Sequence, residues 1–170
     1  IAVVERFLDA ETVEWLRGYE FTGDIDGYRE GELYFPNSPI LTVRGTFAEA
    51  VVLETLILSI LNHDSAIASA AARMVSAASR RPIIEMGSRR THEWAAVASA
   101  RAAYLAGVAA TSNLEAARTY GVPSAGTAAH SFTLAFTEPD GANEKAAFAA
   151  QIETLGVGTT LLVDTFDITQ

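Results

Sequence analysis

The second half of the sequence alternates short apolar runs with helix-like segments, and this alternation restricts the possible folds more than any other feature. The expected order is strand 81–86, helix 91–106, strand 107–111, helix 113–120, strand 121–128, helix 143–155 and strand 159–165. Such alternation predicts parallel βαβ units, because two parallel strands need a crossover connection between them. The series has four expected parallel strands and ends on the fourth. A sheet of this kind keeps an open edge and uncovered apolar faces. We therefore expect an α/β layer that is incomplete by itself.

Two parallel architectures fit this alternation. One is the first half of a (βα)8 barrel, and the other is an open, doubly wound sheet. No Gly-x-Gly-x-x-Gly follows any of the expected strands, which weakens the case for a dinucleotide-binding sheet. Gly121 and Gly156 stand just past expected helix ends, and Asn143 stands at an expected helix start, where these residue types are favoured as caps.

The first half of the chain has a different pattern. Residues 1–20 carry apolar side chains at helical spacing and predict one or two short helices. The runs 32–35 and 40–43 are rich in β-forming residues, and the Gly, Pro and Asn residues around them are typical of turns. We therefore expect antiparallel strands in this region.

Three segments follow from these patterns. Residues 1–45 are expected to form the end of a small N-terminal α+β domain, and residues 81–170 the first half of the parallel barrel. Residues 46–80 are expected to be connecting, buried helices, because they are apolar almost all round at first and then rich in Ala and Ser. Thr46 and Glu49 fit a capping box, which would start the first of these helices and carry it to about Leu61.

Composition excludes several classes of partner and chemistry. The formal net charge is -9 and the isoelectric point is near 4.7, which argues against nucleic acid and anionic membranes as partners. The absence of Cys excludes disulfides and thiolate chemistry and fits a cytoplasmic protein. The apolar run 50–61 is too short to span a membrane. The chain opens without Met or a signal-peptide pattern, so we expect a fragment of a longer protein.

Polar residues follow each expected strand. They lie in segments 86–90, 111–113, 126–131 and 164–167. Ligands of parallel α/β folds bind at the carboxyl ends of the strands, so these segments are the candidate site. Arginine suits a carboxylate or phosphate, and a lone His is a candidate acid, base or nucleophile.

Four tracts at these strand ends resemble the nicotinate phosphoribosyltransferase family in order and spacing. They are EMGSRR (85–90), ATSN (110–113), YGVPSAGTAAHSF (120–132) and LLVDTFD (161–167), and the stretch 28–55 matches as well. The resemblance implies a reaction of nicotinate with phosphoribosyl pyrophosphate that gives nicotinate mononucleotide and pyrophosphate, for NAD salvage. It also implies ATP hydrolysis through a phosphorylated His, with Mg²⁺, in a homodimer.

The same resemblance assigns roles to residues. His130 occupies the phosphohistidine position, Arg89 the position that contacts the pyridine substrate, with Arg90 as the alternative, and Met86 replaces a stacking Phe. Ser112 favours nicotinate over nicotinamide as the substrate, because the nicotinamide-using relative carries an Asp at this position. No metal ligand is expected. The expected substrate-binding residues are Met86, Gly87, Ser88, Arg89, Arg90, Thr111, Ser112, Asn113, Gly126, Thr127, Ser131, Asp164 and Asp167.

Other functions stay open at this point. A quinolinate or nicotinamide phosphoribosyltransferase would share the fold, although the quinolinate enzymes lack the AHSF tract. A catalytically inactive scaffold is a hypothesis of another class. The family's acidic DSGD tract and glycine-rich phosphate loop are not in this sequence. We therefore do not expect the 170 residues alone to turn over substrate.

Overall fold

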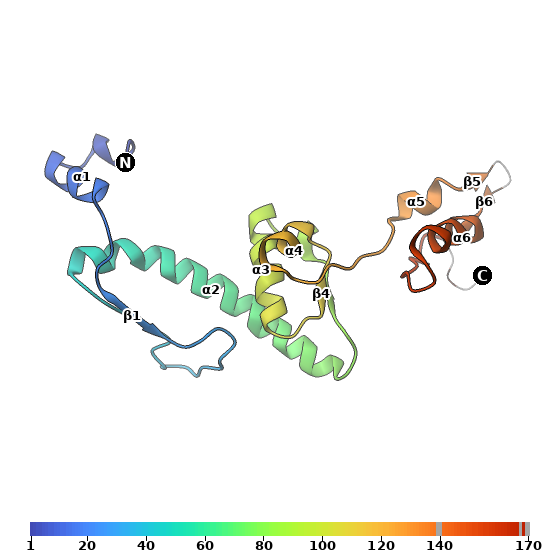
Figure 1. The fold of residues 1–170 in the computed structure, drawn as a ribbon, viewed down its shortest axis with the longest axis horizontal. Helices are drawn as coiled ribbons and strands as arrows, with labels where there is room; N and C mark the ends of the chain where they lie inside the picture. The colour runs from blue at the N-terminus through green and yellow to red at the C-terminus, as the bar shows by residue number, and fades with distance from the viewer. Residues whose placement is uncertain (139–140, 167, 169–170) are drawn as a thin grey trace.

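A computed structural model describes residues 1–138, 141–166 and 168. The chain is extended and forms three successive groups of elements along its long axis (Figure 1). Two short helices, a hairpin and a long helix form the first group, a small parallel α/β unit follows, and a helical group lies near the C-terminus. The fold is thus mixed α/β with small antiparallel and parallel sheets.

The N-terminal group begins with two short helices, as the sequence predicts. A 3-10 helix, η1, spans Val4–Arg6, and α1 spans Ala10–Arg17. The Asp9 side chain starts α1 by accepting a hydrogen bond from the Thr12 amide at 2.9 Å. This N-cap satisfies an amide that has no partner inside the helix.

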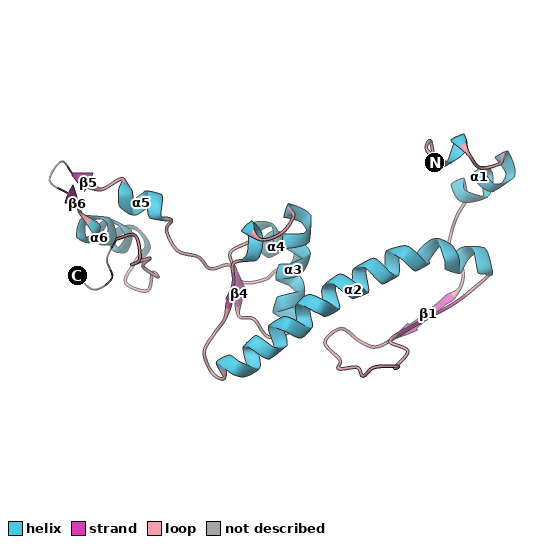
Figure 2. Cartoon of the chain, turned by 180° about the vertical axis from the view of Figure 1, so that it is seen from behind, coloured by secondary structure: helices cyan, strands magenta, loops and turns pink. Residues whose placement is uncertain are grey.

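The antiparallel pair that follows differs from the prediction in its first strand. β1 spans Asp24–Gly27 and pairs with β2, Leu41–Arg44, in the register Asp24↔Arg44 and Gly27↔Leu41. The expected strand at 32–35 is wrong: these residues lie in the long loop between β1 and β2 (Figure 2). The physical reason is that a strand needs a pairing partner, and residues 32–35 have none among the described residues, so their β-forming composition is not enough.

The helix α2 is a single element of 32 residues, Phe47–Ala78, and not the two helices expected. No helix-breaking residue separates the two expected helices, because residues 47–78 contain neither Gly nor Pro. The capping box of Thr46 and Glu49 is confirmed. The expected burial is not seen in these 170 residues, where Leu56, Leu58 and Ile60 are each more than half exposed, and it stays a prediction for the longer protein.

By length and composition alone, α2 also passes as a possible membrane span, and no residue of its apolar window is buried. Its C-terminal part packs against α3 (Glu93–Leu105). The core there contains Ala71, Ala103 and Val108, with Ile67 and Val75 against them. Small side chains allow the two helices to approach each other closely.

The central unit confirms the predicted βαβ pattern for its first two strands. β3 (Ile84–Glu85) and β4 (Ala110–Thr111) are parallel neighbours, with α3 as the crossover and α4 (Leu114–Tyr120) after β4. The expected strand 121–128 is reduced to a parallel bridge between Thr111 and Ser124. A 3-10 turn, η2, spans Gly87–Arg89 directly after β3.

The C-terminal group holds α5 (His130–Leu134), the antiparallel pair β5 (Thr137–Glu138) and β6 (Gly141–Ala142), and α6 (Glu144–Leu155). Only α6, with Asn143 as its N-cap, is as predicted. The described residues of the expected strand 159–165 form no strand, and no barrel is seen in the part of the chain that the structure describes. A parallel strand at 159–165 would need a neighbouring strand that the described residues do not provide.

Candidate functional site

The carboxyl ends of β3 and β4 bring two of the predicted segments together. Glu85 lies opposite Thr111 in the parallel register, and the Ser112 amide donates to the Glu85 carbonyl at 2.9 Å. The turn η2 therefore starts beside the residues that lead into α4. Residues 86–90 and 111–113, which are far apart in the sequence, share one edge of this small sheet, as the parallel pattern predicts.

A carboxylate that is not among the predicted residues holds this edge together. Glu85 accepts a hydrogen bond from the Thr111 hydroxyl at 2.6 Å through Oε2, and a short one from the Gly87 amide through Oε1. The Thr111 hydroxyl in turn accepts from the Asn113 amide at 3.0 Å. Thr111 has an exposed fraction of 0%, so its expected substrate contact would have to be indirect.

Asn113 makes a second link between the two strand ends. Its Nδ2 donates to Ser88 Oγ at 3.1 Å, while its Oδ1 accepts from the Ala116 amide at 2.9 Å and so starts α4. The Asn113 side chain makes both bonds at the same time, one through its nitrogen and one through its oxygen. Ser88 and Asn113 also line an open cavity of about 370 Å³, together with Glu93, Trp94, Ala96, Val97 and Glu115.

The remaining predicted residues at this edge face solvent. Arg89, Arg90 and Ser112 are exposed, and Met86 is 50% exposed, so Met86 is not a core residue. Within the residues that the structure describes, neither Arg89 nor Arg90 pairs with a carboxylate. Two cations without an internal partner beside a polar edge are suited to an anionic ligand.

His130 belongs to a second cluster. It is the first residue of α5, its Nδ1 lies 3.0 Å from Thr165 Oγ1, and its Nε2 lies 3.8 Å from Asp164 Oδ1. The side chains of His130 and Asp164 are 51% and 64% exposed. Ser131 on the same helix is exposed as well, whereas Asp167 lies outside the described residues.

The two clusters are separate in this structure. The segment 125–129, which carries Gly126 and Thr127, runs in an extended path from the α3–α4 unit to α5 (Figure 1). The sequence places all four strand ends at one edge, but the structure joins the first two directly, the third through the bridge at Ser124, and the fourth only to His130.

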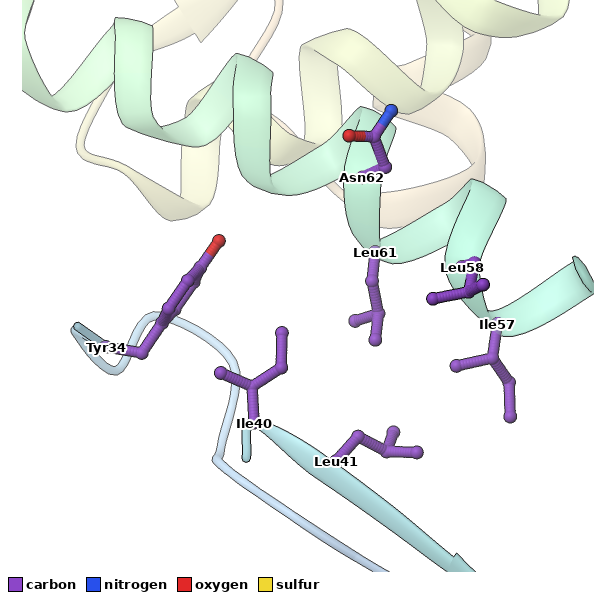
Figure 3. Close-up of a pocket in the computed structure, with 7 residues that line it drawn as sticks. All are labelled: Tyr34, Ile40, Leu41, Ile57, Leu58, Leu61 and Asn62. Atoms are coloured by element: carbon purple, nitrogen blue, oxygen red, sulfur yellow. The ribbon is translucent and has the colours of Figure 1, made fainter. Parts of the chain in front are cut away.

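Another cavity, of about 300 Å³, has a mostly apolar lining. It lies between the β1–β2 loop, β2 and α2, and is lined by Tyr34, Ile40, Leu41, Ile57, Leu58, Leu61 and Asn62 (Figure 3). The side chains of Ile40 and Leu41 point toward Leu61 and Ile57 across the gap. Its chemistry is that of a packing surface.

Comparison with known proteins shows to which protein family the chain belongs. The model of the nicotinate phosphoribosyltransferase N-terminal domain matches residues 3–62. The chain is 68% identical to nicotinate phosphoribosyltransferase pncB1 of Mycobacterium tuberculosis, over 98% of this chain and 38% of that protein. This chain belongs to the nicotinate phosphoribosyltransferase family. The resemblance inferred from the strand-end tracts is thereby confirmed.

Other members of the nicotinate phosphoribosyltransferase family extend the likeness. Nicotinate phosphoribosyltransferase pncB2 of M. tuberculosis is 47% identical, over 92% of this chain and 33% of that protein. The crystal structure of human nicotinic acid phosphoribosyltransferase superposes with a TM-score of 0.71 and 29% identity, over 92% of this chain and 36% of that one. The chain thus spans less than two-fifths of the length of these relatives. The limits that the sequence analysis sets between the three segments, at residues 45 and 80, stay predictions.

Proposed function

We propose that the protein to which this chain belongs is a nicotinate phosphoribosyltransferase of NAD salvage. It would join nicotinate to phosphoribosyl pyrophosphate, releasing pyrophosphate and nicotinate mononucleotide, with coupled ATP hydrolysis. The observation that carries the proposal is the 68% identity to a nicotinate phosphoribosyltransferase across 98% of this chain. The phosphoribosyl and pyrophosphate sites are expected mostly in parts of the protein outside these 170 residues.

The edge formed by β3 and β4 would bind the pyridine. The guanidinium of Arg89 suits a bidentate bond to the nicotinate carboxylate, and Arg90 is the alternative cation. Ser112 places a neutral hydroxyl nearby, which avoids the repulsion that a carboxylate would exert on nicotinate. The exposed thioether of Met86 is suited to contact with an aromatic face.

The cluster around His130 would carry the phosphoryl group. With Nδ1 as donor to the Thr165 hydroxyl, the imidazole keeps its Nε2 lone pair free for attack. An Nε2–P bond would form to the γ-phosphorus of ATP while the bond to the bridging oxygen breaks, and ADP would leave with that electron pair. Gly126, Thr127 and Ser131 lie close in sequence and are expected to bind phosphate oxygens.

The donor set near His130 suits Mg²⁺ only as an ion that arrives with phosphates. No group of three or more His, Asp or Glu side chains gathers in the described part of the chain. Mg²⁺ commonly keeps several waters and takes one or two carboxylates together with substrate phosphates. Asp164 and Asp167 are expected from the sequence to bind substrate and not the metal directly, and they would orient ribose hydroxyls or a water bound to such an ion.

We further propose that β3 and β4 are the first strands of a (βα)8 barrel that the rest of the protein completes, and that the protein is a cytoplasmic homodimer. The parallel β3–β4 pair and the exposed apolar side of α2 support this, since both need cover to be stable in water. The net charge of -9 supports the absence of nucleic-acid and membrane partners.

The test is steady-state kinetics of the full-length protein with phosphoribosyl pyrophosphate and, in turn, nicotinate, nicotinamide and quinolinate, with and without ATP. We expect turnover of nicotinate and stimulation by ATP. Arg89→Ala should lower kcat/KM for nicotinate at least about 30-fold if the bound substrate buries the pair, because loss of one partner of a buried charged pair costs about 2–5 kcal/mol. The matched control, Arg90→Ala, should cost much less.

Each other result has a defined meaning. Preference for quinolinate or nicotinamide would replace the proposed substrate, and no turnover with any pyridine would favour the inactive scaffold. Equal losses in the two Arg variants would reject the choice of Arg89.

A further inference from the structure

We propose that Glu85 is a positioning residue, whose carboxylate fixes the loop bearing Arg89 against the loop bearing Ser112 and thereby sets the affinity for nicotinate. The inference rests on the proposed function, since it concerns the pyridine edge of that site. Neither the residues predicted from the sequence nor the likeness to relatives assigns this Glu a role.

The first observation is a closed ring of hydrogen bonds. The Gly87 amide and the Thr111 hydroxyl both donate to the Glu85 carboxylate, and the Asn113 amide donates to Thr111 Oγ1. Asn113 Nδ2 then donates to Ser88 Oγ, next to Gly87, which closes the ring. A ring of this kind holds the two loops in one relative position, because the bonds to Thr111 and Ser88 each join one loop to the other.

The second observation concerns the absence of a side chain at residue 87. A Cβ on Gly87 would lie 2.6 Å from Glu85 Oε1, well inside contact distance. The backbone of Gly87 is not in the left-handed region, so conformational freedom is not the reason for a glycine here. The residue makes room for the Glu85 carboxylate, and the carboxylate occupies that room because Thr111 holds its other oxygen.

The ring includes the residues on either side of the proposed ligands. Arg89 is on η2, which starts at Gly87, and Ser112 stands between Thr111 and Asn113. A change in the ring would therefore move the guanidinium relative to the hydroxyl. A bidentate contact to a carboxylate depends on such placement, since small displacements weaken both bonds at once.

The chemistry of the carboxylate makes Glu85→Gln a sharp test. An ionised Glu offers an acceptor oxygen to each of the two donors, whereas the Gln amide has one acceptor oxygen and one NH2 group. The amide can satisfy only one of Gly87 N–H and Thr111 O–H. Glu85→Asp keeps the charge but shortens the side chain by one methylene, so it should fail to bridge both donors and should not rescue the defect.

The experiment measures kcat and both Michaelis constants in the full-length protein. In Glu85→Gln, we expect the KM for nicotinate to rise about tenfold, equivalent to loss of a hydrogen bond of about 1.4 kcal/mol, while the KM for phosphoribosyl pyrophosphate changes less than about twofold. If Glu85→Gln does not fold, Gly87→Ala is the second variant. It keeps the carboxylate but displaces it, so it should also raise the KM for nicotinate.

Two controls separate positioning from general damage. Glu49 is also a carboxylate that joins distant segments, through Thr22 and Thr46, but it lies at the start of α2. Glu49→Gln should lower thermal stability and leave the KM for nicotinate unchanged. In an Arg89→Ala background, Glu85→Gln should have an effect below about twofold, because the contact through which it acts is already lost.

The inference is overturned if Glu85→Gln and Gly87→Ala leave the KM for nicotinate unchanged, if both Michaelis constants rise together, or if the Glu85 and Arg89 effects multiply. These results require an active wild-type protein, so they would leave the proposed function intact. A wild-type protein without nicotinate turnover would instead reject the proposed function and, with it, this role of Glu85.

Discussion

Replacement of Thr111 by Val tests whether the hydroxyl at the end of β4 is the centre of the polar edge. Val has nearly the same shape as Thr, so no cavity should form at this fully buried position. The variant removes the donor to Glu85 Oε2 at 2.6 Å and the acceptor for the Asn113 amide at 3.0 Å. A hydrogen bond to a charged group contributes about 1.5–3 kcal/mol and a neutral one about 0.5–1.5 kcal/mol. The sum predicts a loss of about 2–4.5 kcal/mol.

The matched control is Thr111→Ser, which keeps the hydroxyl and loses one methyl group, at a cost of about 1 kcal/mol. Both variants of the full-length protein would be unfolded in urea, and amide hydrogen exchange would be followed at Gly87 and Asn113. We expect Val to lower the unfolding midpoint more than Ser and to speed exchange at both amides. If Val is as stable as Ser, or if exchange at Asn113 is unchanged, the hydroxyl does not hold this edge together.

Three further predictions concern specificity, phosphorylation and pH. Ser112→Asp should weaken nicotinate use and raise nicotinamide use; unchanged nicotinate efficiency would place Ser112 away from the substrate carboxyl. His130→Ala should abolish the acid-labile, base-stable label from γ-labelled ATP but leave some ATP-independent synthesis, and a label on His92 or His63 would reject His130. Hydrogen bonds from the Thr46 hydroxyl and amide, and then from Thr22, lower the pKa of Glu49 from 4.5 to about 2. Glu49 therefore stabilises the folded state fully above pH 4.5, and this contribution is lost as the pH falls through 2. Acid unfolding below pH 4.5 should be shallower in Glu49→Gln, and an unchanged slope would contradict the coupling.

The starts and ends of several helices could be predicted from the sequence because capping signals are local. The capping box at Thr46 and Glu49, the Asn143 cap and the left-handed Gly121 all stand where the sequence places them. The strands could not be predicted as well, because each one depends on a partner elsewhere in the chain. Asp24–Gly27 is a strand only because β2 pairs with it, and 159–165 is not one among the described residues.

The candidate site divides in the same way. The parallel pattern predicts that residues after β3 and β4 meet, and they do. Glu85 could not be found in this way, because a single Glu in an apolar run is usually an exposed strand residue, and its partner Thr111 is 26 positions away. The pairing of His130 with Thr165, 35 positions apart, also depends on how the chain returns after α6.

The sequence and the structure disagree most about α2, and the proposed function accounts for the difference. The helix has the composition of a buried element, yet Leu56 and Leu58 are 57% and 58% exposed. Full burial of one such side chain contributes about 1.5–3 kcal/mol, so an uncovered apolar helix is costly in water. The chain spans 38% of its relative from M. tuberculosis. In the protein that we propose, further barrel strands and a second subunit would cover this face. We therefore expect α2, which is exposed in these 170 residues, to be buried in the complete protein.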